Sequence, residues 1–252
     1  MIALISDIHG NLESLTTVLE MLDREKPGET HCLGDVLGYG ASPVACLDLV
    51  KERCHSWIRG NHEQGLIFYA EDFNPRAKAA LDWTRDEINA LPRVRRREIW
   101  NILDATPETQ SIAGGEVLLV HGSPLDPVRE YVLPGATADP ERVAGWFRAM
   151  GTHRICFLGH SHVPFVLFEG GRVFQPRGEE LEVDLGEERC LVNVGSVGQP
   201  RDGDPRACFA LLEERRRLRF VRLPYDVQGA MERIRAVEDL PDALADRLEI
   251  GR

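Results

Sequence analysis

Side chains able to bind metal ions follow several short apolar runs of this 252-residue sequence. Each run ends in a polar turn that contains glycine, and together the turns supply two aspartates, one asparagine and five of the eight histidines: Asp7, His9, Asp35, Asn61, His62, His121, His160 and His162. Carboxylate and imidazole groups are preferred ligands of divalent first-row metals. No cysteine is among them, which argues against a structural zinc site built from thiolates. The residue types therefore predict metal binding.

Each of these motifs, taken alone, has a simpler explanation. Asp7 and His9 are also typical of a turn or a helix cap, and Asp35 and Asn61 follow glycine as ordinary turn residues do. The motif at 159–162 is more suggestive, because alternate residues can point to the same side. Neither capping nor turn formation requires five histidines after successive apolar runs. Their joint occurrence favours the metal site.

The apolar runs are predicted strands, since runs of about four apolar residues flanked by glycine suit buried strands. They lie at Ile2–Ile5, His31–Leu33, Ser56–Ile58, Val117–Val120 and Ile155–Leu158. Between the first three, leucines and valines recur at three- and four-residue spacing, which predicts amphipathic helices. Alternating strands and helices indicate an α/β fold with parallel strands. In such sheets functional residues gather beyond the carboxyl ends of the strands, where all the polar turns fall.

The remainder of the chain adds helices and hairpins. Residues 64–104 are predicted to be helical, and their basic cluster between Arg93 and Arg97 is more typical of a solvated helix face than of a binding patch. Two β-hairpins are predicted, at 163–174 and 207–223, followed by one or two helices after Tyr225. Because the sequence has no repeat, low-complexity tract or long linker, residues 1–252 are predicted to form a single domain.

Composition argues against several classes of protein. The net charge of −11 disfavours a broad surface for nucleic acid or anionic membranes, and no apolar stretch approaches the roughly 20 residues of a membrane helix. The first residues have no basic segment before their apolar run, so we expect a strand there and not a signal peptide. Six scattered cysteines without a Cys-x-x-Cys pair suggest buried thiols in a reducing compartment, so we expect a cytoplasmic protein.

The motifs resemble, in order, those of the calcineurin-like metallophosphoesterase superfamily. That family's motifs are Asp-x-His, Gly-Asp, Gly-Asn-His followed by Glu or Asp, a solitary histidine after a strand, and Gly-His-x-His. In this sequence they are Asp7-Ile8-His9, Gly34-Asp35, Gly60-Asn61-His62-Glu63, His121 and Gly159-His160-Ser161-His162. The resemblance spans residues 7–162 and implies a four-layer α/β/β/α sandwich of two mixed sheets, the metallo-dependent phosphatase fold. It is specific for the fold and the metal site, and much less so for the substrate.

The resemblance also implies a role for each position. One metal would be held by Asp7, His9 and His162, a second by Asn61, His121 and His160, and Asp35 would bridge the two. His62 would not bind metal but would face the leaving-group or phosphoryl oxygens, as general acid or electrostatic stabiliser. The implied cofactor is a pair of divalent ions, drawn from Mn, Fe, Zn, Co and Ni, that share a hydroxide able to attack phosphorus. Such ions outweigh the aspartates, so an acidic protein can still offer a cationic pocket.

The second motif departs from that of the family's phosphoprotein phosphatases, which reads Gly-Asp-x-x-Asp-Arg-Gly. Here Gly38 and Tyr39 replace the aspartate that supports the catalytic histidine and the arginine that grips phosphate. A guanidinium fork suits the doubly charged phosphate of a monoester, whereas a diester carries one negative charge. We therefore expect a phosphodiesterase for small phosphoesters or nucleotides, similar to the bacterial branch of small broad-range phosphodiesterases.

Three further residues are candidates for substrate contact. Arg201 belongs to a loop, Asn193–Asp202, that resembles the glycine-serine loop of that bacterial branch, and it would either supply the missing cation or form a surface salt bridge. Tyr39 would stack on a base or, as we favour, pack against the helix that follows it. Asn11 would bind a phosphate oxygen or cap the helix that starts at Leu12.

Other functions stay open at this point. A phosphomonoesterase or protein phosphatase, and a dinucleoside polyphosphate hydrolase, would use the same metal site. A non-catalytic scaffold of the same fold is disfavoured, because such proteins tend to lose ligands, whereas this sequence retains all eight positions.

Overall fold

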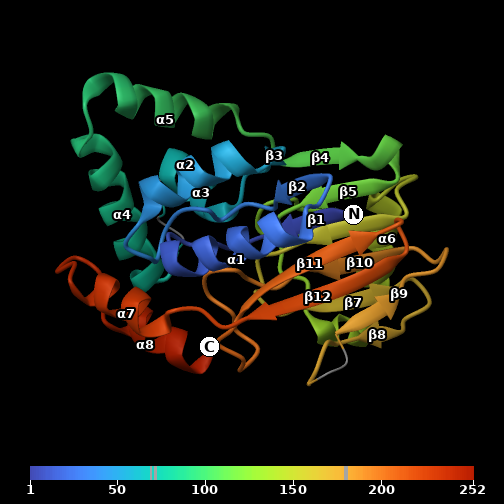
Figure 1. Ribbon diagram of the computed structural model, residues 1–252. Coiled ribbons are helices and arrows are strands. Elements are labelled where there is room, and N and C mark those ends of the chain that lie inside the picture. Colours follow the sequence, from blue (N-terminus) through green and yellow to red (C-terminus); the bar gives the residue numbers. More distant parts are fainter. Residues whose placement is uncertain (69, 71–72, 179–180) are drawn as a thin grey trace.

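The computed structural model describes residues 1–68, 70, 73–178 and 181–252. Within these residues, twelve strands form two six-stranded mixed sheets (Figure 1). Sheet A contains, in spatial order, β3 (Ser56–Trp57), β2 (Glu29–Cys32), β1 (Ile2–Ile5), β11 (Ala207–Glu213), β12 (Arg217–Leu223) and β9 (Glu182–Asp184). Sheet B contains β4 (Thr109–Ile112), β5 (Val117–Val120), β6 (Ile155–Leu158), β10 (Cys190–Asn193), β7 (Phe165–Phe168) and β8 (Val173–Phe174).

Helices cover the outer faces of the two sheets and one end of the molecule. The same ranges contain α1 (Leu12–Glu25), α2 (Pro43–Arg53), α3 (Asn61–Phe68), α4 (Pro75–Ala90), α5 (Arg93–Ala105), α6 (Pro140–Ala149), α7 (Val227–Arg235) and α8 (Ala243–Ile250), with 3-10 turns η1 (Ala113–Gly115) and η2 (Pro134–Ala138). Proline occupies the first turn of α2, α4 and α6, where its missing N–H costs no helical hydrogen bond.

Alternating side chains of the strands build the layers. In β1, Ala3 and Ile5 pack against α1 and α2, whereas Leu4 points the other way, into the core between the sheets. The far face of sheet B is covered by α6 through side chains such as Trp146 and Phe147. Helix, sheet, sheet and helix therefore succeed one another, which confirms the predicted α/β/β/α sandwich.

A fourth apolar cluster connects the C-terminal helices to the rest of the fold. Met231 of α7 and Leu248 of α8 pack with Ala80 of α4 and with the ring of Tyr39. Figure 1 shows α7 and α8 beside α4, at the end of the molecule remote from β8 and β9. The C-terminal helices thereby lie next to the loop that follows β2.

Strand directions bring the predicted polar turns to common edges. β1, β2 and β3 are parallel neighbours, as are β5, β6 and β10, so the carboxyl ends within each trio lie together. The two predicted hairpins are confirmed by the antiparallel pairs β7–β8 and β11–β12. The predicted strand His31–Leu33 is wrong in its limits: β2 starts at Glu29 and ends at Cys32, because its pairing with β1 runs from Ile2–Glu29 to Ile5–Cys32.

The predicted helical segment at 64–104 is present as α3, α4 and α5, which are separated by short non-helical connections; positions 69, 71 and 72 lie outside the described residues. No helix in the described part of the chain is long and apolar enough to span a membrane.

Candidate metal centre

The side chains predicted to bind metal converge at the carboxyl ends of the parallel strands. They form two groups, and within each group the ligand atoms lie within 4.8 Å of one another. One group is Asp7, His9 and His162, and the other is Asp35, His121 and His160. A third, overlapping group contains His9, Asp35 and His62. All of these residues are buried. Residues from five separate turns thus meet in one place, as the sequence pattern predicts.

Hydrogen bonds to backbone carbonyls fix which ring nitrogens are free. His9 Nδ1 lies 3.2 Å from the Leu37 carbonyl oxygen, and His162 Nδ1 lies 2.6 Å from that of Gln199. Because a carbonyl only accepts, both Nδ1 atoms carry the proton, and each Nε2 of a neutral ring keeps its lone pair. The two Nε2 atoms are nevertheless only 3.2 Å apart. Facing lone pairs at this distance repel each other unless a cation lies between them, so this pair fits a metal ion.

The second group shows the same arrangement. His121 Nδ1 donates to the Leu33 carbonyl at 2.8 Å, which leaves Nε2 to face two acceptors, Asn61 Oδ1 at 3.0 Å and Asp35 Oδ2 at 3.4 Å. His160 is held in the opposite sense, because its Nε2 donates to the Arg129 carbonyl at 2.9 Å and its Nδ1 is left free. The donor set therefore fits a second divalent ion.

Asp35 lies between the two groups. Its Oδ2 is 3.6 Å from His9 Nε2 and 3.4 Å from His121 Nε2, whereas its Oδ1 accepts the backbone N–H of His62 at 2.8 Å. One carboxylate oxygen is thus fixed by the backbone and the other faces ligands of both groups. This position suits the bridging role that the resemblance implies.

The charges of the site favour an ion pair between Asp35 and His121. Burial acts to raise the pKa of Asp35, but His121 and His62 nearby outweigh it and leave that pKa well below its usual value. Burial acts to lower the pKa of His121, yet the Asp35 carboxylate raises it to about 9. A proton shared by this pair stands in for the positive charge that a metal ion would supply.

Strained backbone aims the ligands inward. The residues with φ between 51° and 65° include Asp7, His9, Asp35, His160 and His162. Left-handed conformations are costly for residues other than glycine and concentrate at functional sites. Hydrogen bonds also connect the turns that carry these ligands. The N–H of Asp7 donates to the Gly34 carbonyl at 3.0 Å, and the N–H of His160 donates to Asp7 Oδ2 at 3.1 Å.

Glu63 is a buried residue of the site to which the sequence analysis assigned no role. Its Oε1 accepts the N–H groups of Val36 and Leu37, and its Oε2 accepts those of Asp35 and Gly60, at 2.8–3.1 Å. Burial and the Asp35 charge raise the pKa of Glu63 to about 7, opposed by these N–H donors. With two donors on each oxygen, the side chain binds as a carboxylate. In the sequence, its place in the Gly-Asn-His-Glu motif was the only indication that Glu63 belongs to the site.

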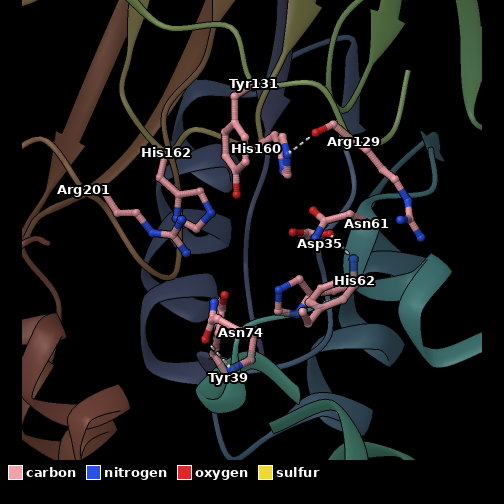
Figure 2. Close-up of a pocket in the computed structure, with 12 residues that line it drawn as sticks. Asp35, Tyr39, Asn61, His62, Asn74, Arg129, Tyr131, His160, His162 and Arg201 are labelled. Atoms are coloured by element: carbon pink, nitrogen blue, oxygen red, sulfur yellow. Dashed lines mark hydrogen bonds between the residues drawn. The ribbon is translucent and has the colours of Figure 1, made fainter. Parts of the chain in front are cut away.

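A cavity of about 230 Å³ opens over the centre. Figure 2 shows Tyr131, Arg201 and His62 pointing into it from different sides. The wall is formed by Asp35, Tyr39, Asn61, His62, Phe73, Asn74, Ala77, Arg129, Tyr131, His160, His162 and Arg201. Tyr131, which the sequence analysis did not select, stacks on His160 with ring centroids 3.8 Å apart. Among the described wall residues, Asp35 is the sole carboxylate, so the substrate side of the cavity is predominantly neutral or basic.

His62 occupies the position expected for a residue that acts on the substrate. It lines the cavity, and its ring packs against Tyr39 with centroids 4.4 Å apart. Its Nδ1 faces Gly38, where an added Cβ would lie 2.1 Å away, and finds no hydrogen-bond partner in the described part of the chain. Burial lowers the pKa of His62 to about 4. Among the described residues, no carboxylate thus takes the hydrogen-bonding place of the aspartate that supports this histidine in phosphoprotein phosphatases.

The three candidate substrate contacts fall in different places. Arg201 and Tyr39 line the cavity. Asn11 does not belong to its described wall: its Oδ1 accepts the Ser14 N–H at 3.1 Å and caps α1, and its Nδ2 donates to the Gly198 carbonyl at 2.9 Å. Asn11 therefore caps α1, the alternative given for it above, and its side chain is not placed to contact a substrate in the cavity.

Comparisons with known proteins agree with the geometry. The family model described as "Calcineurin-like phosphoesterase superfamily domain" matches residues 1–217. The uncharacterized protein MJ0912 of Methanocaldococcus jannaschii is 34% identical over 259 aligned residues, which cover 100% of this chain and 98% of that protein. A metallophosphoesterase from Sphaerobacter thermophilus is 32% identical, with a TM-score of 0.82 and coverage of 100% of this chain and 98% of the other. The hypothetical protein PH1004 from Pyrococcus horikoshii OT3 shares the fold at 21% identity, with a TM-score of 0.78 and coverage of 100% and 99%.

These matches show that the chain belongs to the calcineurin-like phosphoesterase superfamily. It is a metallophosphoesterase, a hydrolase of phosphoric ester bonds. The cofactor of this family is a pair of divalent metal ions, and the two ligand groups described above fit it.

Proposed function

We propose that this protein is a metal-dependent phosphodiesterase for small phosphodiesters, including nucleotides. The observation that carries the proposal is the place of Tyr39. Its ring is buried against His9 and His62, at centroid distances of 4.6 and 4.4 Å, where the second motif of the phosphoprotein phosphatases has its phosphate-gripping arginine. A tyrosine there supplies no fork for the dianion of a monoester, and the single charge of a diester needs less neutralisation.

The proposed roles follow from the positions of the side chains. Asp7, His9 and His162 would hold one ion, Asn61, His121 and His160 would hold the other, and Asp35 would contribute to both. When bound, the ions would neutralise phosphoryl charge and activate water for attack on phosphorus. His62, on the cavity wall, contacts the leaving-group or phosphoryl oxygens. Arg201 binds an anionic oxygen of the substrate, and Tyr131 offers an aromatic face to an organic group.

The test compares two chromogenic substrates in the presence of Mn²⁺. We expect kcat/KM to be higher for bis(p-nitrophenyl) phosphate than for p-nitrophenyl phosphate. His62→Asn should lower kcat on the diester by about 10²–10⁴-fold, the usual range for a proton-transfer or hydrogen-bonding group, with bound metal unchanged. Asp35→Asn should lose both metal and activity. A preference for the monoester would contradict the proposal.

We also propose a reducing, cytoplasmic setting. The six cysteines are free, and all but the partly buried Cys54 are buried. Burial raises the pKa values of Cys54, Cys190 and Cys208 to about 12, so these thiols stay protonated and unreactive.

A further inference from the structure

Two arginines from distant parts of the chain lie near one aromatic ring beside the metal centre. Arg201 follows β10 in the loop that returns toward β11, and Arg247 belongs to α8. Their guanidinium carbons lie 5.8 and 5.9 Å from the centroid of the Tyr39 ring. Distances of this size allow each cation to interact with the π face. The C-terminal helices thus add a second positive charge next to a residue of the cavity wall.

Neither guanidinium pairs with an aspartate or glutamate side chain among the residues that the structure describes. Arg201 Nη2 donates to Gln199 Oε1 at 2.7 Å and its Nε to no described acceptor, while Arg247 Nε donates to the main-chain oxygen of Arg252 at 2.7 Å. The contrast with Arg222 is informative, since that buried arginine forms an ion pair with Asp202. The fold therefore pairs a buried guanidinium with a carboxylate side chain elsewhere and gives these two no such side chain.

A partly buried pair of like charges is unfavourable without an anion. Burial, followed by the charge of Arg201, lowers the pKa of Arg247 to about 10. Tyr39, which lies beneath both cations, is itself held at a φ of 61°, a left-handed conformation that is strained for a bulky residue. A strained residue beside two guanidinium groups that have no carboxylate side chain as partner indicates a binding function more than a structural one.

We propose that Arg201 and Arg247 form a second anion subsite, which binds a phosphate group of the substrate other than the one that is cleaved. This inference rests on the proposed phosphodiesterase function and names its substrate class: phosphodiesters that carry an additional phosphate. Arg201 connects the two sites, because its side chain lines the cavity and its backbone N–H donates to the carbonyl of His162 at 3.2 Å. A simple diester brings one negative charge, which leaves the arginine pair uncompensated beside a cationic metal centre.

The experiment compares two dinucleotides that differ only in a terminal phosphate, adenylyl-(3′→5′)-adenosine and its 5′-phosphorylated form. With the Mn²⁺-loaded wild type we expect the phosphorylated dinucleotide to have the lower KM. In Arg247→Gln, the preference for the phosphorylated dinucleotide in kcat/KM should fall about tenfold, the size expected for one charge-assisted hydrogen bond. Arg247→Lys should restore part of it. Arg235→Gln, which removes an exposed arginine of α7 that pairs with Asp246, should leave the preference unchanged.

Binding gives a second measurement. On a His62→Asn background, calorimetry should show tighter binding of the phosphorylated dinucleotide, and Arg247→Gln should abolish the difference. Equal KM values for the two dinucleotides in the wild type, no hydrolysis of either, or an equal loss on both in Arg247→Gln would overturn the subsite. Hydrolysis of bis(p-nitrophenyl) phosphate by the same wild-type preparation reports separately on the proposed function, because this substrate has no second phosphate.

Discussion

Glu63 shows how a single residue fixes the metal-binding turns from behind. It contributes no atom to either ligand group, yet it joins the loop after β2 to the start of α3 through four N–H donors. Those two segments carry Asp35 and Asn61. An apolar side chain or an amide at this position would leave buried N–H groups without acceptors, which is costly in a low-dielectric interior.

Glu63→Gln should therefore destabilise the protein and weaken metal binding. One carboxylate oxygen becomes an NH₂ group that faces two N–H donors, so we expect a loss of about 2–4 kcal/mol in the free energy of unfolding. Urea denaturation and titration with Mn²⁺ measure the two effects. Glu87→Gln, at an exposed position of α4, should change stability by less than about 0.5 kcal/mol. If both variants behaved like the wild type, the positioning role of Glu63 would be wrong.

At this scale the sequence predicted the convergence of the ligand residues but not the residues that support them. The ligands were recognisable because carboxylates and imidazoles follow several strands in a fixed order. Glu63 ends the Gly-Asn-His-Glu motif, but its bonds to backbone amides depend on the folded turns, so the motif did not reveal its role. Arg247 was equally invisible, because its approach to Tyr39 depends on how α8 packs against α4.

The turns after the strands are the elements that decide the geometry of the centre. In the turn after β2, Gly38 has a φ of 81°, which favours glycine, and an added Cβ would collide with the ring of His62. Both facts require glycine at this position. This turn replaces the motif in which the phosphoprotein phosphatases carry a charged pair. The His62 ring therefore packs against Gly38, where the phosphoprotein phosphatases have an aspartate that supports the catalytic histidine.

Gly38→Ala should impair catalysis more than its effect on stability explains. The left-handed φ alone costs about 1–2 kcal/mol, but the new methyl group would also displace the His62 ring, and a shift of about 1 Å can lower kcat by about 10²-fold. Gly171→Ala is a matched control, since its φ is 88° and nothing lies within 4 Å of the added Cβ. Steady-state kinetics and thermal unfolding separate the effects. Equal kcat values for the two variants would contradict this account.

Among the elements, strands with continuous apolar runs were predicted well and short polar strands were not. β5 and β6 match the predicted runs residue for residue. β4, with the sequence Thr-Gln-Ser-Ile, and the three-residue β9 have no such run and exist because β5 and β12 offer antiparallel partners. Pairing of this kind is a tertiary effect that local sequence does not encode.

On the scale of the whole molecule, the metal centre joins the two sheets. Asp7 and Asp35 follow strands of sheet A, whereas His121 and His160 follow strands of sheet B. Bound ions would therefore crosslink both halves of the sandwich and relieve the repulsion among facing lone pairs and carboxylates. The layered fold was predicted through the family resemblance that the motifs carry. The way α7 and α8 close one end was not predicted, since their apolar faces fit many arrangements.

Removal of metal should accordingly lower the melting temperature. Saturation at about a thousand times Kd contributes about 4 kcal/mol, which for a chain of this size corresponds to a Tm shift of about 10 °C. Thermal unfolding in EDTA and in Mn²⁺ measures the shift, and Asp35→Asn should show almost none of it. A wild-type Tm that does not respond to Mn²⁺ would argue against ion binding at this centre.

The position of β1 in sheet A has a consequence for biosynthesis. β1 is flanked by β2 on one edge and by β11 on the other, and Ile2 pairs with Leu212. During translation, the outer edge of β1 keeps unpaired backbone groups until residues 207–212 have left the ribosome. Asp7 and His9 follow β1 directly. The pairing of β1 with β11, which contributes no ligand, therefore determines when these two ligands reach their final positions. We therefore expect the nascent chain to bind metal only after residues 207–212 have emerged.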